Sequence, residues 1–181
     1  KGMTNIQMIT GQSASQAKET VDEFKQLGAE MHVTNTEIIA GGEELLRAGY
    51  NAQEAKDMMS ASILGSKVSG QDTKAVTEQL IAMKNAFGLS ADSMEHYVDV
   101  ISKMDNSSAS SFAEIADAVQ RTAFSAQQAG TPLDTLITYI TTVSEKTRKS
   151  AETIGESFKT IYARYSNIKL GNMDEDGKSI N

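Results

Sequence analysis

The stretch Ala48-Gly49-Tyr50-Asn51-Ala52 ends one apolar-periodic segment and begins the next. Glycine commonly follows the last turn of a helix, and asparagine accepts a hydrogen bond from a free amide at a helix start. The same arrangement returns at Phe87-Gly88-Leu89-Ser90-Ala91 and at Ala129-Gly130-Thr131-Pro132-Leu133. The three glycines lie about 40 residues apart, near the length of one helical hairpin. The chain is therefore predicted to consist of helix pairs, which favours a structural or interaction protein.

Composition supports helices and excludes several classes of protein. One proline in 181 residues favours helices with short joints over a sheet with many tight turns. The absence of cysteine excludes a disulfide framework and a thiolate metal site. A net charge of −7 argues against binding to a nucleic-acid backbone, which needs clustered Lys and Arg.

The sequence shows neither a membrane span nor a signal peptide. No stretch approaches the ~20 consecutive apolar residues that a membrane span needs, and no signal peptide follows Lys1. Because the sequence begins without methionine and stops in an acidic stretch, we expect a piece of something longer.

Capping residues mark the predicted helix starts. In a capping box, a side-chain oxygen accepts the amide three residues later, and a Glu or Gln there reaches back. The sequence has such boxes at Ser13–Gln16, Thr34–Glu37, Asn51–Glu54 and Ser111–Glu114. Asp72 and Ser90 mark two further starts, and Thr131 precedes another with Pro132 predicted at the first helical position, where no amide is needed. Residues 1–11 give no clear pattern.

Gly41-Gly42 lies inside the helix predicted between Thr34 and Gly49. Each glycine costs roughly 1 kcal/mol relative to alanine in a helix interior. The pair therefore indicates either close packing against a bare backbone or a local break, and the sequence leaves both open.

Apolar residues recur at helical spacing along most of the chain. One predicted face holds Val76, Leu80, Met83 and Phe87, and the last helix shows Ile154, Phe158, Ile161 and Tyr165. We predict an all-α fold, an array of about seven or eight short antiparallel helices without a sheet. Residues 1–33 are expected to hold one helix, residues 34–168 a core domain, and residues 169–181 an acidic loop. The residues assigned to the structural joints are Gly49, Asn51, Gly70, Gly88, Ser90, Gly130, Thr131 and Pro132.

Catalytic and metal-binding patterns are weak. His96 lies near Glu95 and Asp99, but there is no second histidine on that face and no HExxH motif, which favours an exposed helix histidine. No Gly-x-Ser-x-Gly elbow follows a strand pattern. We therefore predict no catalytic residue, no metal ligand and no cofactor.

The acidic segment 171–179 resembles two ligand-binding loops. Its two glycines are separated by one residue too many for a phosphate loop. Asn172, Asp174, Asp176 and Gly177 match the first half of a calcium loop, but the closing glutamate would fall beyond the last residue given. A solvated acidic turn is the preferred interpretation.

Basic and methionine-rich positions suggest two possible surfaces. Tyr162 and Tyr165 interleave with a basic set consisting of Lys146, Arg148, Lys149, Lys159, Arg164 and Lys169. In an acidic chain this set is more typical of a solvated helix face than of a nucleic-acid surface. The methionines are interpreted as flexible core filler, with an adaptable partner surface as the alternative for Met58, Met59, Met83 and Met94.

Four segments resemble the core region of phage tail tape-measure proteins. They are Glu43–Ala55, Ala86–Ser93, Ala126–Leu133 and Gly155–Tyr165, and the resemblance covers roughly Thr34 to Asp176. It implies one domain of a long, mostly helical, non-enzymatic protein that occupies the tail tube, sets tail length and leaves before DNA passes. It also implies that the protein is made in the host cytoplasm and resides in the virion tail, with the tail tube protein and tail assembly chaperones as partners. Self-association is possible, and no contact with nucleic acid or membrane is expected.

Two other functions remain open. A generic helical-repeat module would bind a peptide or helix on a concave surface lined by Met and Tyr. An enzyme would need a pocket that joins His96 to carboxylates. Within the tape-measure interpretation, thin helix faces and capped joints are expected to let the region rearrange between compact and extended states.

Overall fold

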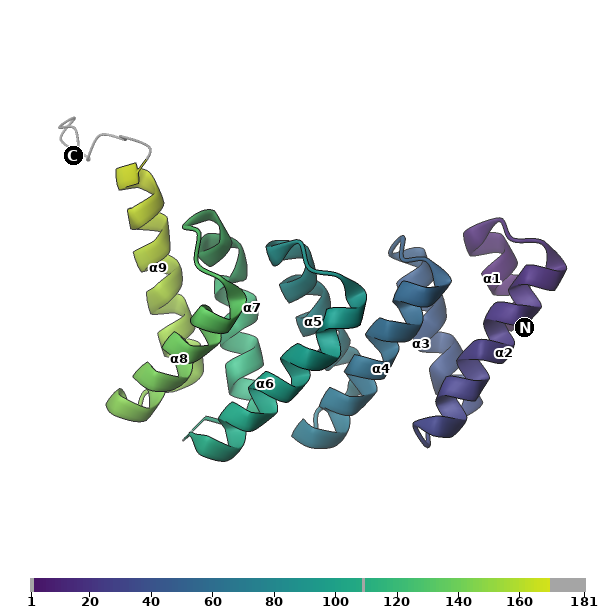
Figure 1. Ribbon diagram of the computed structural model, residues 1–181, viewed down its shortest axis with the longest axis horizontal. Coiled ribbons are helices and arrows are strands. Elements are labelled where there is room, and N and C mark those ends of the chain that lie inside the picture. The colour runs from purple at the N-terminus through teal and green to yellow at the C-terminus, as the bar shows by residue number, and fades with distance from the viewer. Residues whose placement is uncertain (1, 109, 170–181) are drawn as a thin grey trace. The chain divides into compact units, whose positions relative to one another are not determined.

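The computed structural model describes residues 2–108 and 110–169, and all the regular structure within them is helical (Figure 1). The helices are α1 (Gly2–Thr10), α2 (Ala14–Glu30), α3 (Asn35–Arg47), α4 (Ala52–Ser69), α5 (Thr73–Phe87), η1 (Ala91–Ser93), α6 (Met94–Ser107), α7 (Phe112–Gln128), α8 (Leu133–Thr147) and α9 (Ala151–Lys169). No strand occurs in these two ranges. The all-α prediction is confirmed.

The chain divides into two compact units. Unit 1 comprises Lys1–Leu80 with Ser90–Val98, and unit 2 comprises Ile81–Leu89 with Asp99–Asn181. Within unit 1, α1 to α4 run alternately up and down, and within unit 2 α7, α8 and α9 do the same (Figure 1). The core domain predicted at residues 34–168 includes parts of both units.

Capping boxes begin α2, α3, α4 and α7. At α4, the Asn51 side-chain oxygen accepts the Glu54 amide at 2.9 Å, and the Glu54 carboxylate accepts the Asn51 amide at 3.0 Å. Equivalent pairs form at Ser13, Thr34 and Ser111. Each of these helix starts is thus stabilised by atoms within four residues, and each contributes about 1 kcal/mol.

Helix α1 shows that residues 1–11 contain more structure than their pattern indicates. Ile6 is completely buried, and the Asn5 side-chain amide donates to both carboxylate oxygens of Glu43 at 3.1 Å. The expectation of a single helix before residue 34 is therefore wrong. A nine-residue helix is marginal on its own, so contacts with α3 stabilise it, and these contacts leave no local signal in the sequence.

Helix α3 is continuous through Gly41 and Gly42, so of the two alternatives the local break is wrong, and close packing is correct for Gly42. A Cβ atom at Gly42 would lie 2.2 Å from Cε2 of Phe24, a distance that no side chain tolerates. Phe24 of α2 is fully buried against this bare backbone. Gly41 differs, because a Cβ atom there would lie 3.7 Å from the Met59 sulfur, an ordinary contact.

In unit 2, α7 and α9 pack backbone to backbone. A Cβ atom at Gly155 would lie 3.0 Å from both the Cα and the carbonyl oxygen of Ala118. The Thr122 hydroxyl donates to the Gly155 carbonyl at 3.1 Å, and Thr122 is fully buried. Glycine, alanine and threonine thus allow two helices to approach closely and join them with a buried hydrogen bond.

Candidate interaction site

A groove of about 430 Å³ lies in unit 1 among α3, α4 and the first turns of α5. Its volume is within the range of ~300–1,000 Å³ that is common for ligand sites. Apolar side chains line its inner part: Ile38 and Leu45 from α3, and Met59 and Ile63 from α4. All four side chains are buried, with only 2–4% of their surface exposed, so the groove is a depression directly over the unit 1 core.

Charged side chains form the two walls of the groove. Glu37 and Glu44 lie on the α3 side, whereas Lys67 and Lys74 lie on the side of α4 and α5. The Glu37 carboxylate accepts hydrogen bonds from the Thr34 hydroxyl at 2.6 Å and the Thr34 amide at 3.2 Å. These hydrogen bonds lower the pKa of Glu37, so a fixed negative charge lines this wall at neutral pH.

The lysine wall is partly held in place by the backbone. The Lys67 ammonium donates to the carbonyl of Met31 at 2.6 Å, which tethers it to the end of α2. Lys74 begins α5, where the Asp72 side chain accepts its amide at 2.8 Å. The groove therefore has an apolar floor, an acidic wall and a basic wall, an arrangement that suits an amphipathic segment with charged flanks.

The apolar stripe of α9 changes from buried to exposed along the helix. Ile154 is buried and Phe158 half-buried, but Ile161 is 57% exposed and Tyr165 is 51% exposed. The helical spacing of these four residues therefore corresponds to burial for the first two and not for the last two. Tyr162 remains buried, so α9 is still packed at this level, and Ile161 and Tyr165 form an uncovered apolar face beside its buried side.

The α7–α9 contact carries a small charge network on its outer side. The Arg121 guanidinium pairs with Asp117 at 2.8 Å on its own helix, and with Glu152 at 3.4 Å and Glu156 at 3.7 Å on α9. Hydrogen bonding to Asp117 is the largest cause of the raised pKa of Arg121. All four side chains are more than a third exposed, so solvent screens these pairs and each contributes little to stability.

The predicted joint residues occupy the connections between helices. Gly49, Gly70, Gly88 and Gly130 take positive φ values of 93°, 70°, 64° and 82°. Asn51 caps α4, Ser90 precedes η1 without a side-chain cap, and Thr131 precedes Pro132. Pro132 is the N-cap of α8 and Leu133 is the first helical residue, so the prediction of Pro132 as the first helical residue is wrong by one position.

The groove is lined by none of these joint residues. It includes Gly41, Glu44 and Lys74, none of which the sequence marked as functional. The one signal of the groove in the sequence was Gly41, a glycine inside a predicted helix.

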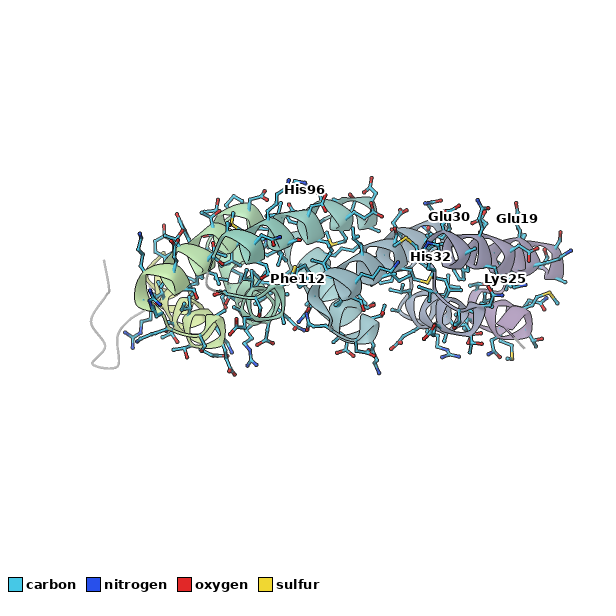
Figure 2. The ribbon with its side chains drawn as sticks, turned by 90° about the horizontal axis from the view of Figure 1, so that it is seen from below. Glu19, Lys25, Glu30, His32, His96 and Phe112 are labelled. Atoms are coloured by element: carbon cyan, nitrogen blue, oxygen red, sulfur yellow. The ribbon has the colours of Figure 1, made fainter. Side chains whose placement is uncertain are left out.

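Among the described residues, the side chains considered for catalysis or metal binding do not form a site. His96 is exposed on α6, where its ring meets Tyr97 edge to face at 5.2 Å (Figure 2). Within residues 2–108 and 110–169, no three His, Asp or Glu side chains are placed to hold a metal ion. Asn172, Asp174, Asp176, Gly177 and the phosphate-loop resemblance lie outside these ranges.

The predictions for the methionines and for the basic residues have different outcomes. Met58, Met83 and Met94 are buried and fill the core, so the partner-surface interpretation is wrong for them. Met59 is buried too, but it lines the groove of unit 1, so for Met59 the partner-surface interpretation stays a prediction. The basic residues are exposed, as expected for a solvated face, at Lys146, Arg148, Lys149, Lys159 and Arg164. The side chain of Lys169 lies outside the described part. None of the described helices is long and apolar enough to cross a membrane.

Comparisons with known proteins connect this helical array to phage tails. The family model of phage-related minor tail proteins matches residues 21–179. The chain is also similar to the tape measure protein of Pneumococcus phage Dp-1, with 28% identity over 132 residues. That alignment covers 73% of this chain and 12% of the relative, so the chain spans only a small part of the relative's length. No solved structure matches the chain. Since the family model covers most of its residues, the chain belongs to the family of phage-related minor tail proteins.

Proposed function

We propose that this chain is a structural, non-enzymatic segment of a tape-measure protein that lies in the tail tube and contributes to tail length. The observation that carries this proposal is the family match over residues 21–179, together with similarity to a phage tape measure protein. The short capped helices suit such a role, because a helical chain has a defined length per residue. In this role the segment is made in the host cytoplasm and becomes part of the virion tail.

Tail length provides the direct test. A continuous α-helix of 181 residues is about 270 Å long. In-frame deletion of this segment from the phage gene should shorten the tail by up to that length, and duplication should lengthen it equally. Electron microscopy of released particles measures both changes.

An exchange variant separates length from sequence. Replacing the segment with an unrelated helical stretch of equal length should restore the original tail length. Tails of unchanged length in both the deletion and the duplication variant would contradict the proposal.

The proposed role also names partners. In the tail, the segment would contact the tail tube protein and, before assembly, the tail assembly chaperones. Crosslinking in assembling tails should recover both from a chain labelled at the exposed residue Ser157. Recovery of neither, while crosslinks within the tape-measure protein form efficiently, would contradict this part of the proposal.

A helical-repeat binding module is the second candidate function, and the groove of unit 1 supports it. An apolar floor between oppositely charged walls fits the polar and apolar faces of a helix. Such a function would be retained by the isolated chain, whereas a role in tail length requires the parent protein. Binding assays with the isolated chain therefore distinguish the two.

A further inference from the structure

We propose that copies of this chain associate head to tail, with the exposed Ile161/Tyr165 face of α9 in one copy docked into the α3–α4–α5 groove of the next. This association is independent of the tail-length role. It joins the uncovered apolar face in unit 2 of one molecule to the apolar depression in unit 1 of another.

The α9 face has the properties of an incomplete contact. Ile161 and Tyr165 lie four residues apart on one side of the helix and continue the stripe that begins at the buried Ile154. Exposed single apolar residues are common, but two large ones in register on a helix form a ridge that can enter a groove. An aromatic side chain such as Tyr165 also buries about 150–250 Å² in a good contact.

The groove has a matching shape. Its volume of about 430 Å³ has room for a pair of large side chains. Gly41 lies in its lining, although neither a positive φ nor close packing requires glycine there. A helix glycine with no structural reason of its own removes a side chain from the groove, which opens the floor to an approaching helix.

Charge favours the same pairing. Arg164 is exposed beside Tyr165, at the edge of the apolar face, and it forms no ion pair with the side chains described in residues 2–166. Glu37 and Glu44 lie on the acidic wall of the groove, and hydrogen bonds from Thr34 hold Glu37 in place. A helix docked by Ile161 and Tyr165 with Arg164 toward α3 would pair its guanidinium with these carboxylates.

The two surfaces lie on different elements of the chain, so the contact is heterologous and each added copy presents a fresh groove or a fresh α9 face. Such a contact forms rings or open chains of copies. Because the two surfaces differ, the contact can be tested by mixing a groove variant with an α9 variant as well as by disrupting each surface alone.

The test uses purified chains in sedimentation velocity over a range of concentrations. The unaltered chain should form species larger than a dimer as concentration rises. Ile161→Asp on the α9 face and Gly41→Leu in the groove should each weaken association at least tenfold. Mixing these two variants should restore association but stop it at a one-to-one pair, because only one intact groove and one intact α9 face can meet.

Matched controls separate this interface from general stickiness. Met8→Asp removes a more exposed apolar side chain, 73% exposed on α1, and should leave association unchanged. Glu44→Arg and Arg164→Glu should each weaken association, and combining them in one chain should restore it. These two exposed positions keep the proposal testable if Gly41→Leu disturbs folding.

A chain that stays monomeric at every concentration would overturn the proposal. So would variants that fail to pair when mixed although far-UV circular dichroism shows both folded. Full association of Ile161→Asp would show that a different surface joins the copies, which would also overturn it.

Discussion

The pairs α7/α9 and α3/α5, each separated by one helix in the sequence, differ in how closely their two helices approach each other. In unit 2, α7 and α9 meet at Gly155 and Ala118, with a Thr122 hydrogen bond between them. In unit 1, α3 and α5 form opposite sides of a groove of about 430 Å³ above α4. Each pair flanks one helix that runs in the opposite direction. We call α7 and α9 the closed pair because their backbones are in contact, and α3 and α5 the open pair because a groove lies between them.

The comparison shows that small residues close a helix pair only when they face each other. Gly155 lies directly against Ala118, whereas Gly41 lines the groove and meets only the Met59 side chain of α4 at an ordinary distance. The effect of a helix glycine on packing therefore depends on the residue opposite, which a single sequence does not reveal.

The largest expected effect comes from breaking the closed pair. Gly155→Leu places a branched side chain where even a Cβ atom lies 3.0 Å from the Ala118 backbone. Because backbone cannot move as a side chain does, the variant should lose roughly 3 kcal/mol of unfolding free energy. Urea unfolding followed by circular dichroism measures this loss, and an unchanged midpoint would show that α7 and α9 do not pack as described.

A second, smaller change removes the hydrogen bond of the closed pair while keeping its shape. Thr122→Val should cost about 1 kcal/mol, because the hydroxyl no longer bonds to the Gly155 and Ala118 carbonyls. Hydrogen exchange should speed up in α7 and α9 and stay unchanged in α2 and α3. Thr77→Val is the control, since Thr77 is half-buried and its hydroxyl bonds to the Thr73 carbonyl within α5.

The open pair should respond in the opposite direction. Gly41→Ala adds a methyl group at an ordinary distance from Met59 and improves helix propensity, so it should stabilise the protein by about 0.5–1 kcal/mol. Gly42→Ala is the matched neighbour and should destabilise, because its methyl would collide with the Phe24 ring. A loss of stability in Gly41→Ala would mean that the groove has no room for a methyl group beside Met59.

The smallest effect concerns the acidic wall of the groove. Hydrogen bonds from Thr34 lower the Glu37 pKa below 4.5, so the ionised form is favoured in the folded chain. The resulting stability is present above the unfolded pKa and is lost as pH falls through the folded value. Glu37→Gln should therefore be less stable than the unaltered chain at neutral pH, with the difference shrinking well below pH 4.5. Thermal unfolding at several pH values tests this, and a constant difference would argue against the Thr34 contacts.

Local signals in the sequence predicted much of the fold. The boxes at Ser13, Thr34, Asn51 and Ser111 appear as expected, because a cap depends on residues within four positions. Helix α1 was missed for the opposite reason, since Asn5 and Ile6 depend on partners far along the chain.

The candidate site was not predicted, because its parts depend on long-range packing. Periodicity grouped Ile161 and Tyr165 with Ile154, but periodicity reports a shared side of a helix and not which part of that side a partner covers. The groove likewise brings Glu44 of α3 near Lys74 of α5 through the packing of α4. The buried Met58 and Met83 show the same limit, since core and adaptable surfaces use the same residue type.

The capping boxes have a mechanical consequence. The side-chain bonds that begin α3, α4 and α7 close within four residues, so they survive when one helix is pulled away from another. A force along the chain would therefore leave these helix starts capped while the contacts between helices separate, and the parts that stay helical would rise about 1.5 Å per residue. Because short helices are marginal on their own, unwinding would follow separation. The chain would lengthen in discrete steps, one helix at a time, with the glycines at positions 49, 70 and 130 as the points where direction changes.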